Sequence, residues 1–184
     1  TAAMSQTATP TAAILVIGNE ILSGSTQDAN IAFIARHLSL RGVPLREVRI
    51  VPDVPAAIIG ALNALRESYT YVFTTGGIGP THDDITADCV AAAFGTPIGV
   101  RDDARALLQA YYDARGIELN EARLRMARIP DGAVLIDNPV SAAPGFRLGN
   151  VFVMAGVPKI MQAMLLHADT MIEGGPPVQS RTVA

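Results

Sequence analysis

Segment 74–88 reads TTGGIGPTHDDITAD, and it carries the residue types and spacing best suited to chemistry. The glycines at its turn are Gly76, Gly77 and Gly79. Glycine lets a ligand approach the backbone closely, and a helix that starts just beyond such a turn attracts an anion, most often phosphate. Asp83 and Asp84 suit phosphate only with a hard cation between, and Mg²⁺ is commonly held by one or two carboxylates plus phosphate oxygens. The segment therefore predicts a phosphate–metal loop.

Ordinary structural roles explain parts of the same segment. Glycine is common punctuation between a strand and a helix. Asp84 and Thr86 are both good helix N-caps, and an Asp such as Asp53 before a helix is often one too. The loop is not a Walker A motif, because no Gly-Lys-Ser/Thr follows, and it lacks the third glycine of the dinucleotide fingerprint. The complete string, with its paired Asp, favours function over a simple turn.

Strands and helices alternate along the chain, which favours a parallel sheet with helices on both faces. We expect strands at 12–17, 45–51, 71–75 and 133–136, and helices at 29–41, 54–66, 87–94, 102–115, 120–128 and 157–172. Segments 146–148 and 151–154 flank Gly149-Asn150, a plausible two-residue hairpin turn. The sequence thus predicts a three-layer αβα fold with a mostly parallel central sheet and a late β-hairpin.

Acidic residues follow three successive predicted strands. Loops 18–30, 51–54 and 74–86 carry Glu20 and Asp28, then Asp53, then Asp83 and Asp84. In an open parallel sheet, ligands bind at the carboxyl ends of the strands, near the point where strand order reverses. We therefore expect these loops, together with 141–145, to form one ligand site.

These motifs resemble the molybdopterin-binding, molybdenum-cofactor-biosynthesis domain family. Residues 74–86 resemble its signature, and the form Gly-Pro-Thr-His-Asp-Asp-Ile-Thr is most similar to the N-terminal domains of the competence/damage-inducible protein A group. Residues 17–24 with Asp28 and Asn30, 51–53, 143–146 and 156–158 are similar to the family's other loops. The resemblance spans about residues 12–175.

The resemblance implies roles for particular residues. Asp53 and Asp84 match acidic positions linked with metal-assisted nucleotide chemistry in the family, so they are the expected catalytic residues. Asp83 and Asp84 are the expected metal ligands, and Mg²⁺ is the expected ion. The residues expected to bind a phosphorylated ligand are Gly18, Asn19, Glu20, Thr75, Gly76, Gly77, Gly79, Ser141, Pro144 and Gly145.

The resemblance leaves three functions open. One is pyrophosphate hydrolysis of nucleotides such as ADP-ribose, another is binding or adenylylation of molybdopterin, and the third is a non-catalytic binding module. The acidic set favours chemistry, because a module that only binds an anion gains nothing from Asp53, Asp83 and Asp84. Three positions depart from the pattern of relatives: Ala155 replaces a Pro, Ile160 replaces a Glu, and Ile78 replaces a Thr.

Composition bounds the remaining expectations. The 184 residues suit one domain at 12–175, with a flexible N-terminus at 1–11 and a tail at 176–184. A net charge of −3 gives no attraction to nucleic acid or anionic membrane, and no apolar run reaches the ~20 residues of a membrane span. A single cysteine, Cys89, fits a reducing cytoplasm. The family continues further than this sequence, which fits a truncated or a single-domain member.

Other residues receive structural interpretations. An apolar content of 49% predicts an exposed patch and a homo-oligomer, a dimer or trimer. Cys89 and the methionines of 157–172 are expected in the core, and His82 is expected to be solvated. The basic group at Arg123, Arg125 and Arg128 is expected to form a solvated helix face.

Overall fold

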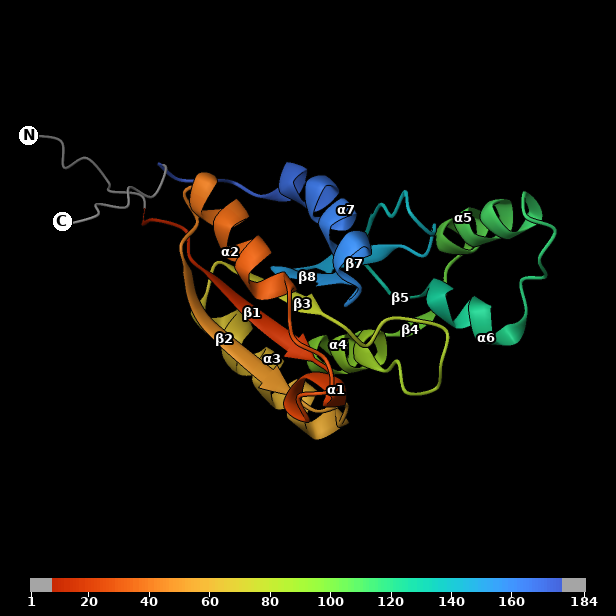
Figure 1. The fold of residues 1–184 in the computed structure, drawn as a ribbon, viewed down its shortest axis with the longest axis horizontal. Helices are drawn as coiled ribbons and strands as arrows, with labels where there is room; N and C mark the ends of the chain where they lie inside the picture. Colours follow the sequence, from red (N-terminus) through yellow and green to blue (C-terminus); the bar gives the residue numbers. More distant parts are fainter. Residues whose placement is uncertain (1–7, 177–184) are drawn as a thin grey trace, which may run out of the picture.

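The computed structural model describes residues 8–176 and contains one six-stranded sheet in the order β2-β1-β3-β8-β7-β6 (Figure 1). The strands are β1 (Ala12–Ile17), β2 (Leu45–Val51), β3 (Tyr71–Thr75), β6 (Val134–Ile136), β7 (Gly145–Leu148) and β8 (Val151–Met154). Pairs β1–β2, β1–β3 and β3–β8 are parallel, whereas β7 is antiparallel to both β6 and β8. The predicted fold class and the hairpin at Gly149-Asn150 are confirmed.

Helices cover both faces of the sheet. The helices α2 (Asn30–Leu40) and α7 (Pro158–Ala168) pack on one face, and α3 (Pro55–Ser68) and α4 (Thr86–Phe94) pack on the other (Figure 1). All six residues of β1 are buried, because this central strand contributes alternate side chains to the two cores. Rings of Phe73 and Phe152 stack in the core beneath α2 and α7, with centroids 4.9 Å apart.

A second, two-stranded sheet corrects the prediction for residues 120–128. A helix forms only at α6 (Glu121–Leu124), where the Asn120 side chain accepts a hydrogen bond from the Arg123 amide. The chain continues through the 3₁₀ turn η1 (Arg125–Ala127) into β5 (Arg128–Pro130), which pairs with β4 (Ile98–Val100). Helix α5 (Asp102–Asp113), α6, η1 and the two-stranded sheet together form a second lobe of the molecule. Neither strand was predicted, because β4 has no periodic pattern around it and β5 begins at the last residue of the expected helix 120–128.

Two other boundaries differ from the expected ones. A four-residue helix, α1 (Asn19–Leu22), lies in the loop after β1, and it was not predicted. The closing helix ends at Ala168 and becomes the 3₁₀ turn η2 (Asp169–Met171), so the predicted helix at 157–172 is too long. Most of the predicted flexible segment 1–11 and the predicted tail at 176–184 lies outside the described residues.

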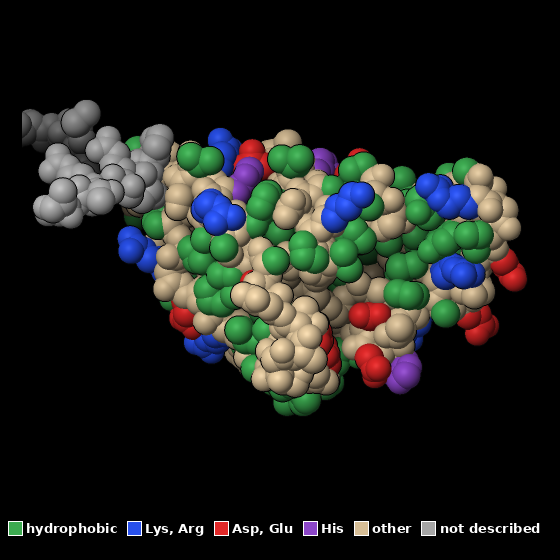
Figure 2. Space-filling view, viewed as in Figure 1, with side chains coloured by type: hydrophobic (Ala, Val, Ile, Leu, Met, Phe, Trp, Pro, Cys, Tyr) green, Lys and Arg blue, Asp and Glu red, His purple; other side chains and the backbone are tan. Residues whose placement is uncertain are grey.

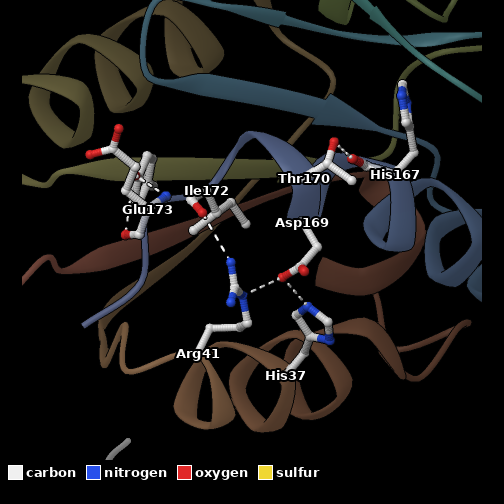
Figure 3. A network of polar contacts seen from close by, with 8 residues as sticks. His37, Arg41, His167, Asp169, Thr170, Ile172 and Glu173 are labelled. Carbon is white, nitrogen blue, oxygen red and sulfur yellow. Dashed lines mark hydrogen bonds and ion pairs between the residues drawn. The ribbon is translucent and has the colours of Figure 1, made fainter. Parts of the chain in front are cut away.

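A polar cluster ties the start of η2, and the residue that follows η2, to the C-terminal end of α2 (Figure 3). Asp169 Oδ1 lies 2.8 Å from both His37 Nε2 and Arg41 Nε, and Arg41 also donates to the Ile172 carbonyl. These contacts hold the C-terminal segment against the layer formed by α2 and α7. Among the helices within residues 8–176, none is long and apolar enough to cross a membrane.

Candidate functional site

The predicted loops meet at the carboxyl ends of β1 and β3, where the chain leaves toward opposite faces of the sheet. The loop after β1 leads to α2, and the loop after β3 leads to α4 on the other face. The two strand ends touch, since a side chain at Gly76 would collide with the Ile17 carbonyl. This is the reversal point of strand order, where open α/β sheets form their crevice.

Residues 76–79, which follow β3, form the glycine loop. This loop is held in place by Thr86, a fully buried residue at the start of α4. Its hydroxyl donates to the Gly76 carbonyl and its amide donates to the Gly77 carbonyl, each at 3.0 Å. Gly77 has a φ of 69°, and a side chain there would collide with the Thr86 hydroxyl. The loop therefore requires glycine at this position for both conformation and space.

Asp84 stabilises the same loop and does not cap α4. Its Oδ2 accepts hydrogen bonds from the Thr81 amide at 3.0 Å and the Thr81 hydroxyl at 2.8 Å. The N-cap position of α4 belongs to Ile85, which makes no side-chain capping bond. The capping interpretations of Asp84 and Thr86 are therefore wrong, because both side chains are directed back to the loop.

Asp53 links the second loop to the first. Its Oδ2 accepts from the Asn19 amide, and the Asn19 Oδ1 accepts from the Asp53 amide, each at 3.1 Å. The N-cap of α3 is Val54, without a side-chain bond, so the capping interpretation of Asp53 is also wrong. The reciprocal pair fixes the start of α1 beside the end of β2 and directs a carboxylate to the strand ends.

Carboxylates from all three loops line one open cavity of about 610 Å³. Its lining includes Glu20, Asp53, Asp83, Asp84 and Gly77. Figure 2 shows acidic side chains beside the hollow in the middle of this face. His82 lies next to Asp83, 3.3 Å from its Oδ1, and both side chains are strongly exposed. The arrangement gathers negative charge where the glycine loop ends.

A second cavity of about 330 Å³ lies on the other side of the loop and is mostly apolar. Ser141 and Pro144 line it, together with the Tyr112 side chain and the loop at 155–158. Positions Ile78, Ala155 and Ile160, where the motifs depart from the family pattern, all line this same cavity. Two of these departures, Ile160 in place of a Glu and Ile78 in place of a Thr, make its wall more apolar than the pattern of relatives would.

Asn138 organises the loop on the far side of the apolar cavity and was missed in the sequence. Only 4% of it is exposed, its Oδ1 accepts from the amides of Val140 and Ser141, and its Nδ2 donates to the Ser141 hydroxyl and the Ala143 carbonyl. Ala142 in this loop has a φ of 66°, a conformation that L-residues rarely adopt. A lone Asn before a turn gave no signal that could have identified it.

Other predicted residues lie beside these cavities or outside them. Thr75 and Gly76 line a small cavity with Glu20, Asp28 and Asn30, while Asp28 Oδ2 accepts from the Ile31 amide at the start of α2. Gly18 and Gly145 line none of these three cavities. At Gly145 a side chain would collide with the Val153 carbonyl, so this glycine permits close strand packing.

Arginines of the second lobe approach the glycine loop, which corrects their interpretation as a purely solvated face. Arg125 and Arg128 line a small cavity with Gly79 and Asp84. Arg128 donates to Asp88 at 2.6 Å, whereas Arg125 Nε is buried and has no partner within the described residues. Arg123 stays outside this cavity and donates to the Glu118 carbonyl.

The carboxylates do not form a ready-made metal site. Within residues 8–176, no three His, Cys, Asp or Glu side chains are close enough to hold an ion together. Asp53 and Asp84 each accept hydrogen bonds through Oδ2, and neither Oδ1 has a hydrogen-bond partner within residues 8–176. Such a donor set suits Mg²⁺ that arrives with phosphate oxygens and keeps several waters.

Comparison with known families agrees with this geometry. Residues 13–169 match the family model MoCF_biosynth, described as "Probable molybdopterin binding domain". The chain belongs to this family. The resemblance inferred from the loops at 17–24 and 74–86 is thereby confirmed.

Individual relatives place the chain among CinA-like members of the family. The CinA protein of Thermoplasma acidophilum, described as having unknown function, superimposes with a TM-score of 0.81 at 34% identity, over 89% of this chain and 98% of that one. A CinA-like protein of Sulfurihydrogenibium is 35% identical over 88% of this chain and 42% of its own length. MoaB of Pyrococcus furiosus shares the fold, with a TM-score of 0.57 at 20% identity, 88% of this chain and 91% of that one.

Curated relatives extend beyond the matched region. A protein of Pyrobaculum calidifontis is 38% identical over 84% of this chain, but the match covers 61% of that protein. A protein of Aeropyrum pernix is 39% identical over 86% of this chain and 61% of its own length. The chain thus spans about three-fifths of the length of these relatives.

Proposed function

We propose that this chain binds a nucleotide together with Mg²⁺ and hydrolyses its phosphoanhydride, as a nucleotide pyrophosphatase acting on ADP-ribose-like substrates. The observation that carries the proposal is the pair of cavities on either side of the glycine loop. One is lined by Glu20, Asp53, Asp83 and Asp84, and the other is apolar and bounded by Ile78, Tyr112 and Ile160. A nucleotide has the same division into a charged part and a flat, less polar part.

The proposed ligand lies across the loop at 77–79. Its base occupies the apolar cavity, and its phosphates pass over the glycines toward the carboxylates. Arg125 supports this placement, because its side chain lies beside Gly79 and its buried Nε has no partner within the described part of the chain. A guanidinium is well suited to a phosphate oxygen.

The proposed reaction adds water to one phosphorus and breaks its bond to the bridging oxygen, which leaves two phosphate monoesters. Asp83 and Asp84 would hold Mg²⁺, which would neutralise charge on the phosphate oxygens. Asp53 is held by Asn19 through Oδ2, and its Oδ1 accepts the proton of the attacking water. Arg125 offsets negative charge on the departing monoester.

A turnover screen tests the proposal. The purified chain is incubated with ADP-ribose, ATP and related dinucleotides, with and without Mg²⁺, and the products are separated by chromatography. We expect AMP and ribose phosphate from ADP-ribose only when Mg²⁺ is present, and loss of that activity in Asp53→Asn. Ligand-induced thermal stabilisation without any product would contradict hydrolysis and support a binding module.

A second candidate is binding or adenylylation of a molybdopterin phosphate. The family match at residues 13–169 favours it, and the apolar cavity of about 330 Å³ has walls suited to a flat pterin. Transfer of AMP from ATP to the pterin phosphate, with release of pyrophosphate, would be its signature. The same screen, run with ATP plus molybdopterin, separates this activity from hydrolysis of ADP-ribose.

A further inference from the structure

Strand β2 ends the large sheet and has no neighbour on its outer side within residues 8–176 (Figure 1). It is seven residues long, which is long for an edge strand, and most of its residues are exposed. An open edge presents unpaired amide and carbonyl groups to any other strand, and proteins usually shorten or cover such edges. This edge is therefore a surface with which another strand can pair.

The backbone groups that face outward can be identified from the hydrogen bonds on the inner side. The Gly18 amide donates to the Val51 carbonyl, so the polar backbone groups of Val51 face β1. Because these groups alternate along a strand, those of Glu47 and Arg49 also face β1. Those of Val48 and Ile50 then face outward, in line with the pairing of Val48 to Ile14 and of Ile50 to Val16.

Three antiparallel registers pair most of β2 (Leu45–Val51) with a second copy through these outward groups about a two-fold axis. They place Glu47, Val48 or Arg49 on the axis. The first register brings Glu47 opposite Glu47 of the second copy, and the third brings Arg49 opposite Arg49. The register centred on Val48 brings each Glu47 opposite an Arg49, on one face of the sheet. Like charges directly opposite destabilise a strand pair and opposite charges stabilise it, so one register alone is favoured.

The other face of β2 gives the same result. Val48 and Ile50 are 37% and 39% exposed, although Ile14 and Val16 beside them on β1 are buried. In the register centred on Val48, the two Val48 side chains meet across the axis. Each Ile50 then lies opposite Arg46, whose aliphatic stem can cover it. Apolar surface and charges are therefore satisfied together.

We propose that two copies of this chain associate through antiparallel pairing of their β2 strands, with Val48 on the two-fold axis. The two sheets then continue into one another, and the edge is covered. The crevice at the strand ends stays open, because the contact runs along the side of the sheet. The dimer is independent of which ligand the crevice binds.

A cysteine pair tests the register. In the proposed dimer, the two Val48 Cα atoms are about 5.5 Å apart, within the span of a disulfide, whereas the two Ile50 residues are several residues out of register. We expect Val48→Cys to form a covalent dimer on mild oxidation and Ile50→Cys, at a residue of similar exposure, to stay uncrosslinked. The native Cys89 is only 4% exposed and contributes little background. Equal crosslinking of both variants, or of neither, overturns the register.

Charge reversal tests the interface without new cysteines. Arg49→Glu places like charges opposite each other and also removes the ion pair of Arg49 with Glu47 within the chain, whereas Glu47→Arg with Arg49→Glu restores opposite charges in both places. Arg36→Glu makes the same charge change at an exposed residue of α2, outside the strand itself. By sedimentation velocity we expect dimers for the unmodified chain, the double variant and Arg36→Glu, and at least a tenfold weaker dimer for Arg49→Glu.

Thermal melts of each variant confirm that the monomers are folded. An unmodified chain that sediments as a monomer or a trimer overturns the proposal. So does an Arg49→Glu variant that associates as tightly as Arg36→Glu, or a double variant that is folded but stays monomeric.

Discussion

Asp84 serves the glycine loop through one carboxylate oxygen, and this limits what a substitution there can do. Its Oδ2 accepts both hydrogen bonds from Thr81, and asparagine can keep an acceptor oxygen in the same place. The loop should therefore survive Asp84→Asn, while the negative charge is lost. Stability and chemistry can be separated at this residue.

We predict that Asp84→Asn leaves the melting temperature nearly unchanged and lowers Mg²⁺-dependent turnover by about 10²–10³, or roughly 3–4 kcal/mol. Asp84→Ala should also cost about 1 kcal/mol of folding stability, because the Thr81 donors lose their partner. Thermal melts and turnover on the best substrate from the screen measure the two effects. Full turnover by Asp84→Asn would exclude a role for its charge.

Asp83 provides the comparison for the paired carboxylates. Its side chain is 79% exposed and makes no bond to the loop, apart from its contact with His82. We predict that Asp83→Asn leaves stability unchanged and reduces the apparent affinity for Mg²⁺ in the turnover assay. A titration of turnover against Mg²⁺ measures this. An unchanged Mg²⁺ dependence would remove Asp83 from the metal ligands.

Titration of the Cys89 thiol makes the folding stability depend on pH. Burial raises the pKa of the Cys89 thiol from 9.0 to about 11, and the nearby Asp88 charge acts in the same direction. The folded state then holds the proton where the unfolded state releases it, so rising pH favours unfolding. We predict that the stability of the unmodified chain relative to Cys89→Ala declines between pH 9 and about 11. Urea melts across this range measure it, and a constant difference would contradict it.

At the scale of elements, the sequence was most informative where apolar patterns are long. Strand β1 lies at its predicted residues because an unbroken apolar run suits a strand buried on both faces. Strands β4 and β5 were not predicted, since β4 follows Pro97 with no periodic pattern around it and β5 begins at Arg128, the last residue of the expected helix 120–128. The lobe that brings Arg125 to the glycine loop depends on this pairing, so its approach could not be foreseen.

At the candidate site, too, the sequence predicted some features and not others. Strand order allowed the loops at 18–30, 51–54 and 74–86 to be placed together, because loops after parallel strands share one edge. The contacts between them could not be foreseen: Asp53 with Asn19 and Asp84 with Thr81 replace the helix caps that local preferences suggested. Tertiary hydrogen bonds outcompeted the local capping preference of these residues.

Asn138 allows a prediction about the loop at 138–143. Asn138→Ala removes the partner of two amides and one carbonyl inside this loop, and we expect a loss of roughly 1–3 kcal/mol in folding stability. Ser141→Ala, which loses only the hydroxyl that Asn138 contacts, should cost less. Urea denaturation compares the two variants. Equal small losses would indicate that Asn138 does not organise the loop.

For the whole molecule, the crevice forms because β1 and β3 send their loops to opposite faces of the sheet. Each layer contributes part of the proposed ligand environment: carboxylates from the loops after β1, β2 and β3, and an apolar cavity closed by α7 and the second lobe. In this proposal neither cavity is sufficient by itself to bind a nucleotide. The acidic cavity repels unaccompanied phosphate, and its carboxylates do not converge on an ion without a ligand.

This arrangement predicts that Mg²⁺ and nucleotide stabilise the fold only together. Mg²⁺ alone should leave the melting temperature nearly unchanged, and ADP-ribose with a chelator should have a small effect. Both together at 100 times their apparent dissociation constant should add about 2.7 kcal/mol to the free energy of unfolding. Asp53→Asn and Asp84→Asn should each reduce this joint effect, whereas Arg36→Glu, remote from the crevice on α2, should not. Differential scanning fluorimetry over a matrix of both concentrations measures it. Strong stabilisation by Mg²⁺ alone would mean that the carboxylates converge without a ligand, which would contradict ligand-dependent metal binding.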